Sequence, residues 1–211
     1  ESETRDGFGF VLKGNVNDLG YQAITTPGSL KAYYEAIENY GTWDWSDVVA
    51  PAISHAENGV IVRPHVSFWW NYGANFGRVG VDERLKFSRT GASAYFNKNG
   101  SLKKIGDRVK IPGMDETLRR IAESGPDIFY TGSIADQIAE DMRKNNGLLS
   151  YDDLSNYSTT ITNPLKGAYR GFEVATNHPP CWGIMLLEML NILEHFDLNT
   201  IGHNTSEYIR I

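Results

Sequence analysis

Apolar residues recur at helical spacing in the first quarter of the chain. Across residues 30–40 they fall three and four positions apart, on one face of a helix, and Gly41 follows as a stop. A second helix is predicted over residues 47–58, with Ser46 as its N-cap and Pro51 near its first turn, where a missing N–H costs little. We expect these two helices to pack as a hairpin.

Later stretches show the same spacing and predict four longer helices, over residues 64–72, 114–124, 133–146 and 182–196. The first of these is rich in Phe, Trp and Tyr. We interpret that cluster as core or interface, because aromatic side chains dominate buried contact area. Ser133 is the expected N-cap of the third helix and Gly147 its end, and a short capped turn of helix is expected at 148–154.

Strands are predicted in three places. Residues 94–105 are expected to form a β-hairpin, and residues 157–162 and 167–176 to form two separate β runs. Across residues 73–91 glycines and charges alternate without a clear period, which predicts a surface excursion. The alternation of helices and strands favours an α/β or α+β layered domain, and we expect residues 1–211 to form a single domain.

Composition and charge narrow the functional classes. Hydrophobic residues make up 41% of the chain and charged residues 22%. No apolar run approaches the roughly 20 residues of a membrane helix, so no membrane-spanning segment is predicted. The net charge of -6 and the sequence pI near 5.4 argue against nucleic-acid binding, because that binding needs a basic face. The one cysteine excludes an intrachain disulfide.

Both ends of the chain indicate a piece of a longer protein. The first six residues lack an initiator methionine and lack the basic-then-apolar pattern of a signal peptide. The last five residues lie inside a predicted helix and carry no cap or stop signal. We therefore expect the protein to be processed or truncated at its start and to continue past its last residue.

Residues 169–190 carry the candidate chemistry, because a β run enters a tight turn and leaves it as an apolar helix. The turn holds Cys181, with His178 three residues earlier and two prolines between them. A thiolate–imidazole pair is one interpretation, since a helix N-terminus lowers a thiol pKa. The alternative is a small buried hydrophobe, which is common for free cysteine.

Metal binding is not predicted from this sequence. The five histidines, His55, His65, His178, His195 and His203, include no pair four residues apart on a helix and no carboxylate spacing typical of zinc. The adjacent Asp152 and Asp153 cap a helix turn, whereas a Ca²⁺ loop needs more oxygen ligands. No cofactor is predicted either.

A series of short motifs, in order along about nine-tenths of the chain, resembles the middle of the large subunit of the γ-glutamyltranspeptidases. None of these motifs is specific alone, but their shared order is a strong signal. They are TPGSL (26–30), YGT (40–42), WSDVVAPAI (45–53), GD (106–107), GPDIFYTG (125–132), IA (134–135), GLL (147–149), DL (153–154), YRG (169–171), LNIL (190–193) and FDL (196–198).

The resemblance implies an N-terminal-nucleophile hydrolase with a four-layer αββα sandwich, an α+β fold of which this chain supplies the helix-rich large-subunit part. Such a precursor cleaves itself, and the new N-terminal threonine of the small subunit is the nucleophile, with its amine as base. The implied reaction transfers a γ-glutamyl group from glutathione or a related amide to water or an amino acid. This chain holds no candidate for that threonine, so no catalytic residue is assigned to it and the small subunit is the expected partner.

The resemblance also points to a site wall. Where the family usually has Pro-Pro-Pro-Ser-Ser-Gly-Gly, this chain has His178-Pro179-Pro180-Cys181-Trp182-Gly183-Ile184. We expect His178, Cys181, Trp182 and Gly183 to border the substrate, in a space that the larger side chains narrow. Arg5 is a further candidate for substrate contact, since a guanidinium fork suits a carboxylate, although its local pattern departs from that of the family's arginine.

Several alternatives stay open at this point. A cephalosporin-acylase-like amidohydrolase fits the altered turn, and a non-catalytic scaffold or binding relative would keep the fold without the site. The acyl donor, the acceptor and the balance between hydrolysis and transfer are open as well. The resemblance implies a periplasmic or extracellular location.

Overall fold

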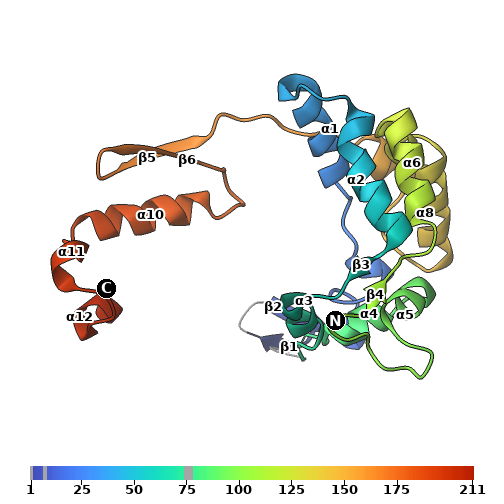
Figure 1. The fold of residues 1–211 in the computed structure, drawn as a ribbon, viewed down its shortest axis with the longest axis horizontal. Helices are drawn as coiled ribbons and strands as arrows, with labels where there is room; N and C mark the ends of the chain where they lie inside the picture. Colours follow the sequence, from blue (N-terminus) through green and yellow to red (C-terminus); the bar gives the residue numbers. More distant parts are fainter. Residues whose placement is uncertain (1, 7–8, 74–77) are drawn as a thin grey trace. The chain divides into compact units, whose positions relative to one another are not determined.

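The computed structural model describes the backbone of residues 2–6, 9–73 and 78–211, and side chains from residue 12 onward. The chain forms two compact units, Glu1–Thr159 and Thr160–Ile211. Figure 1 labels the elements of both units. The prediction of a single domain stays a prediction, because two compact units can belong to one fold.

The first unit is mainly helical, with short antiparallel strand pairs. Its elements are, in order, β1 (Ser2–Asp6), β2 (Gly9–Leu12), the 3₁₀ turns η1 (Lys13–Asn15) and η2 (Tyr21–Ala23), α1 (Ser29–Tyr40), α2 (Trp45–Asn58), β3 (Val60–Ile61), α3 (Pro64–Trp70), α4 (Val81–Lys86), α5 (Arg89–Tyr95), β4 (Arg108–Val109), α6 (Met114–Ser124), α7 (Asp127–Tyr130), α8 (Ser133–Lys144) and α9 (Tyr151–Ser155). Strand β1 pairs with β2 and β3 pairs with β4.

The core of the first unit lies where α7, α8 and α9 meet. It is built around a cluster of buried residues: Tyr130, Ala135, Met142, Leu149 and Leu154. The hydroxyl of Tyr130 donates to the Pro27 carbonyl oxygen at 2.6 Å and accepts from the Lys31 N–H at 3.2 Å. These bonds satisfy the polar tip of a buried aromatic side chain and tie the start of α1 to the core.

Helices α1 and α2 form where the sequence predicts them. The expected hairpin of these two helices is not their main packing, because α2 packs chiefly along α6 and makes fewer contacts with α1. The Trp45 indole N–H donates to the Ile121 carbonyl oxygen at 3.0 Å, and Glu57 forms an ion pair with Arg119 across the same two helices. The predicted N-cap at Ser46 is wrong, because α2 already begins at Trp45 with Asp44 in the cap position.

The predicted position of Pro51, near the first turn of the helix, is also wrong. The proline lies in the interior of α2, beyond the first turn, where its missing N–H leaves the Asp47 carbonyl without the usual helical donor. The helix nevertheless continues to Asn58, and its packing against α6 offsets the lost hydrogen bond.

The hairpin predicted over residues 94–105 is largely wrong. Ala94 and Tyr95 belong to α5, which the Ser88 side chain caps by accepting from the Gly91 N–H. What remains of the hairpin is one antiparallel bridge between Phe96 and Leu102. The stretch predicted as a surface excursion, residues 73–91, is mostly exposed where it is described and contains α4 and the first three residues of α5; its residues 74–77 lie outside the described part of the chain.

The second unit is a β-hairpin with a helix beside it. Its elements are β5 (Leu165–Tyr169), β6 (Phe172–Thr176), α10 (Gly183–Glu194), α11 (Leu198–Ile201) and α12 (Ser206–Arg210). Residues Arg170 and Gly171 turn the hairpin with φ of 49° and 83°, as a two-residue type I′ turn requires.

The predicted β runs of this region therefore need correction. Residues 157–162 form no strand, and the run predicted over 167–176 is two strands that pair in register from Leu165↔Thr176 to Tyr169↔Phe172. The reason is the turn, because left-handed backbone at two successive residues folds the run back on itself.

Burial in the second unit is very low. Across residues 160–211, all of which the structure describes, Gly183 is the one buried residue. The hairpin and α10 contact each other, yet they enclose no apolar side chain completely. Both units combine helices with short antiparallel sheets, in agreement with the predicted α+β class. No helix in the described ranges has the length and apolar character to cross a bilayer.

Candidate active-site turn

The turn between β6 and α10 holds four of the five predicted site residues. His178 Nε2 lies 2.6 Å from the Asn163 carbonyl oxygen. Because a carbonyl oxygen only accepts, Nε2 carries the hydrogen in this contact. The backbone N–H of Cys181 donates to the His178 carbonyl oxygen at 3.0 Å, which closes the turn. The chain entering β5 and the chain leaving β6 are thus joined through one imidazole.

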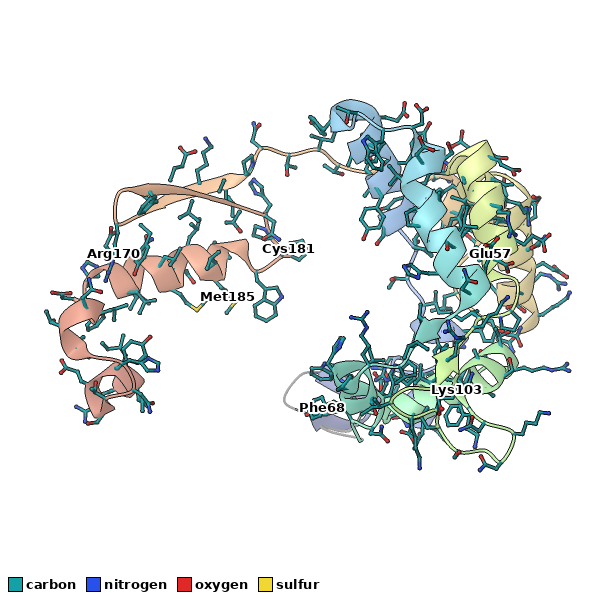
Figure 2. The ribbon with its side chains drawn as sticks, in the orientation of Figure 1. Glu57, Phe68, Lys103, Arg170, Cys181 and Met185 are labelled. Carbon is teal, nitrogen blue, oxygen red and sulfur yellow. The ribbon has the colours of Figure 1, made fainter. Side chains whose placement is uncertain are left out.

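Cys181 is exposed at the start of α10, as Figure 2 shows. Among the described side chains, no hydrogen bond joins its thiol to the His178 ring, whose Nε2 is bonded to Asn163. The geometry therefore does not assemble the thiolate–imidazole pair of the sequence-based hypothesis. The alternative of a small buried hydrophobe is also wrong, since the side chain faces solvent.

Gly183 has a packing role that the sequence did not reveal. A Cβ built on it would collide with the Asn177 carbonyl oxygen and would lie 2.7 Å from both Asn177 Oδ1 and Thr176 Oγ1. The first turn of α10 can approach the end of β6 this closely only because the residue has no side chain. Gly183 thereby fixes the direction in which α10 leaves the turn.

Trp182 stands next to it with an exposed side chain and occupies the N-cap position without a side-chain cap bond. Cys181 and Trp182 thus present their side chains outward from the turn, whereas Gly183 faces the strand end. A molecule that packs against this turn would therefore contact the Cys181 thiol and the Trp182 indole.

Arg5 lies in the backbone of β1, where it pairs with Phe10. Its side chain is outside the described part of the chain, so substrate contact by Arg5 stays a prediction.

Two sets of contacts in the second unit were missed by sequence reasoning. One is the bond from His178 to Asn163. The other is a clamp at the far end of the hairpin, where the Arg170 N–H donates to Glu194 Oε1 at 2.8 Å and its guanidinium donates to the Phe196 carbonyl oxygen at 2.8 Å. The motif YRG at 169–171 held the signal for this clamp, since its glycine permits the type I′ turn that aims Arg170 at the helix end.

The first unit has its own electrostatic anchor. The nearly buried carboxylate of Asp18 accepts from Arg84 at 2.6 Å, from Arg78 at 3.1 Å and from the Val79 N–H at 3.0 Å. Burial alone would raise the pKa of Asp18, but the hydrogen bonds from Arg84, the Val79 N–H and Arg78, together with the positive charge of Arg84, outweigh it and lower that pKa. This cluster fixes the segment that leads into α4.

No group of metal ligands gathers elsewhere in the described residues. No group of three or more His, Cys, Asp or Glu side chains is close enough to hold an ion in that part of the chain. The first unit contains an apolar cavity of about 430 Å³, whose titratable lining residues are His55, Tyr95 and Lys110. Its lining is otherwise mostly aliphatic, so it offers no acyl-transfer chemistry.

Comparison with known proteins shows which family this chain resembles. Residues 4–211 match the family model described as gamma-glutamyltranspeptidase. The chain is 36% identical to a glutathione hydrolase proenzyme of Escherichia coli over 90% of its own length and 31% of that protein. It is 32% identical to an acylase ACY 1 proenzyme of Pseudomonas, over 92% of its length and 34% of that protein. It therefore spans about a third of the length of these relatives.

A solved structure agrees with the sequence matches. The γ-glutamyltranspeptidase of Helicobacter pylori superposes with a TM-score of 0.83 at 28% identity, covering 99% of this chain and 58% of that one. The predicted fold, the helix-rich large-subunit part of an N-terminal-nucleophile hydrolase, is confirmed by this likeness. The chain belongs to the γ-glutamyltranspeptidase family.

Proposed function

We propose that this chain is the large-subunit part of a γ-glutamyltranspeptidase-like amidohydrolase and acyltransferase. The observation that carries the proposal is the match of nearly the whole chain, residues 4–211, to the family, together with the likeness to the Helicobacter pylori γ-glutamyltranspeptidase over 99% of its length. The proposed partner is a small subunit released from the same precursor, in line with the description of both sequence relatives as proenzymes.

The proposed reaction runs through an acyl-enzyme on the N-terminal threonine of that small subunit. Its α-amine takes the hydroxyl proton while the oxygen attacks the γ-amide carbonyl, and the amine leaving group departs with the proton. Water or an amino acid then attacks the ester and releases the γ-glutamyl acid or amide together with the free threonine. The acyl donor is glutathione or a related small amide.

In this proposal the chain contributes a wall of the site and no nucleophile. The exposed side chains of Cys181 and Trp182 would border the acyl donor, His178 would hold the turn through Asn163, and Gly183 would set the start of α10. A guanidinium at Arg5 would suit the donor's carboxylate. We also propose export to the periplasm or the cell exterior.

A second candidate is an acylase that removes a related acyl group, such as a glutaryl side chain of a cephalosporin. Two observations favour it: the acylase proenzyme of Pseudomonas at 32% identity, and the turn, where Cys181 and Trp182 replace small polar residues. The wider side chains leave less room beside the nucleophile, so the acyl group that fits best would differ from γ-glutamyl.

The test uses the full-length precursor. We expect it to yield two bands on a denaturing gel and to release p-nitroaniline from γ-glutamyl-p-nitroanilide. A variant with alanine in place of the threonine that begins the small subunit is the control, and it should give one band and no turnover. Faster release from glutaryl-p-nitroanilide would favour the acylase. An uncleaved precursor without turnover of either anilide would contradict both candidates and favour a scaffold relative.

A further inference from the structure

Asparagine followed by glycine occurs three times in this chain, at Asn58-Gly59, Asn99-Gly100 and Asn146-Gly147. In such a pair the glycine nitrogen can attack the side-chain amide of the asparagine, because glycine has no side chain to obstruct the approach and adopts many backbone conformations. The attack converts the asparagine into an acidic residue. Which pair reacts depends on how firmly its backbone and side chain are held.

The first pair is held firmly at the end of α2. The Asn58 side chain donates to the Ser54 carbonyl oxygen at 2.9 Å, and the Asn58 carbonyl oxygen accepts from the Arg108 guanidinium at 2.8 Å. Gly59 is buried, and a Cβ built on it would lie 2.7 Å from the Val109 carbonyl oxygen. The Gly59 nitrogen therefore has little freedom to approach the Asn58 side chain.

The third pair is held in a comparable way after α8. The Gly147 N–H donates to the Met142 carbonyl oxygen at 2.8 Å, and a Cβ built on Gly147 would collide with the Met142 sulfur atom. Met142 belongs to the buried core cluster, so this glycine packs against the core. The Asn146 carbonyl oxygen accepts from the Gln22 side chain at 3.2 Å. Movement at Gly147 would disturb both sets of contacts.

The second pair lies in an exposed turn, residues 97–100. A Cβ built on Gly100 would meet no atom of the described residues within 4 Å. The Gly100 N–H donates to the Asn97 carbonyl oxygen at 2.8 Å, a bond within the turn itself. Local opening of that bond disturbs no core packing, so it costs less free energy here than at the other two pairs.

The side-chain amide of Asn99 is also activated toward attack. Its Oδ1 accepts from the Ser101 hydroxyl at 2.7 Å and from the Ser101 N–H at 3.1 Å. The Asn97 side-chain amide donates to the same hydroxyl oxygen at 3.2 Å, which leaves the hydroxyl hydrogen for Asn99. Donors aimed at an amide oxygen stabilise the negative charge that this oxygen gains when a nucleophile attacks the carbon.

We propose that Asn99 is a deamidation site. The Gly100 nitrogen bonds to Asn99 Cγ and loses its proton to the solvent, and the side-chain nitrogen leaves as ammonia. The cyclic imide that forms then adds water, and either of its carbonyl groups can open. The product at this position is aspartate or isoaspartate, each of which carries a negative charge at neutral pH where the asparagine is neutral. Water is the co-reactant.

The isoaspartate product also lengthens the backbone of the turn. The turn is closed by the Asn97 N–H, which donates to the Ser101 carbonyl oxygen at 2.8 Å, and by the bridge between Phe96 and Leu102. An extra backbone atom between these partners shifts their register. The modified protein is therefore expected to differ from the original in charge and in the shape of this turn.

Peptide mapping of the full-length protein by mass spectrometry tests this inference. The protein is incubated at mildly alkaline pH in water labelled with heavy oxygen, which enters the product when the imide opens. We expect the Asn99 peptide to convert at least about tenfold faster than the Asn58 and Asn146 peptides, a difference that a small change in activation free energy produces. Equal rates at the three pairs, or no conversion at Asn99, would overturn the proposal.

The same incubation in concentrated urea separates structure from local sequence. With the chain unfolded, the three pairs should convert at similar rates, because neither packing nor the bonds from Ser101 remain. A preference for Asn99 that persists unchanged in urea would contradict selection by the fold.

Ser101→Ala tests the activation of the Asn99 amide. This variant lacks the hydroxyl donor but keeps the backbone N–H, so conversion of Asn99 should slow by about threefold, less than for a donor in an enclosed enzyme site. Ser93→Ala is the matched control, since Ser93 is exposed and its hydroxyl donates to the Thr90 carbonyl oxygen at 2.9 Å. In urea the two variants should convert alike. Equal rates for the two folded variants would overturn the role of Ser101.

Discussion

The two units of this chain use apolar residues in different ways. In the first unit, helix α8 buries Ile134, Ala135 and Met142 against its neighbours and turns charged side chains such as Glu140 to solvent. In the second unit, α10 has more apolar residues than α8 but buries only Gly183. Hydrophobic content alone therefore does not tell which unit is stable by itself; the enclosure of the side chains does.

This difference predicts where each unit draws its stability. The first unit should respond to the loss of a core side chain like an ordinary small domain. The second should respond to changes at its turn, where Gly183 packs closely against the end of β6. The following variants can break or sharpen that contrast.

The largest effect is expected from Leu154→Ala in the first unit. The side chain is fully buried in the core cluster, so its removal leaves a cavity and costs about 3 kcal/mol of unfolding free energy. Leu148→Ala is the matched control, because that leucine is 72% exposed and should change stability little. Urea unfolding followed by tryptophan fluorescence measures both; equal midpoints for the two variants would contradict the assigned core.

Gly183→Ala should have the next largest effect. The added methyl group meets the Asn177 carbonyl oxygen, so the start of α10 must move, at a cost of about 2 kcal/mol. Gly73→Ala is the control, since a Cβ there meets no atom of the described residues within 4 Å and its φ is not in the left-handed region. Thermal melting of the full-length protein compares them, and a melting temperature for Gly183→Ala equal to that of the wild type would show that the close approach is absent.

Asp18→Asn should cost about 1 to 2 kcal/mol near neutral pH, because the charge that Arg84 and Arg78 face is lost. The pKa of Asp18 is lowered in the folded state, so this stability is present above the ordinary aspartate pKa and is lost as the pH falls through the folded pKa. The gap between wild type and variant should therefore close in acid. A gap of constant size from neutral pH down to that range would contradict the anchor.

The smallest effect is expected from Cys181→Ala on turnover by the full-length protein. The thiol has no hydrogen bond to His178 and the proposed nucleophile lies elsewhere, so kcat should stay within about tenfold of the wild type. The KM for the acyl donor is expected to change more than kcat, since the side chain borders the substrate. Loss of all turnover, with normal subunit cleavage, would restore Cys181 as a nucleophile.

Much of the helical structure followed from the sequence. Helices α1, α6, α8 and α10 lie within two residues of their predicted bounds, because each has a regular apolar period and a glycine or capping residue at an end. The failures have separate causes. The hairpin at 165–176 depends on left-handed backbone at Arg170, which is rare for arginine, whereas α5 carries a glycine, which has low helix propensity.

The site turn was located from the sequence, but its internal contacts were not. His178 and Cys181 are three residues apart, which suggested a pair. The His178 imidazole instead contacts the carbonyl oxygen of Asn163, just before β5. Spacing along the chain does not report such a contact. The role of Gly183 was likewise visible only from the oxygen atoms that surround its Cα.

Hydrogen–deuterium exchange tests most directly whether the second unit depends on the rest of the full-length protein for its cover. In the 211-residue chain alone, we predict slow exchange for the backbone amides of α6 and α8 and fast exchange for those of α10, because only the first unit encloses a core. In the full-length protein α10 should become protected to the level of α8. Equal protection of α10 and α8 in the chain alone would contradict this account.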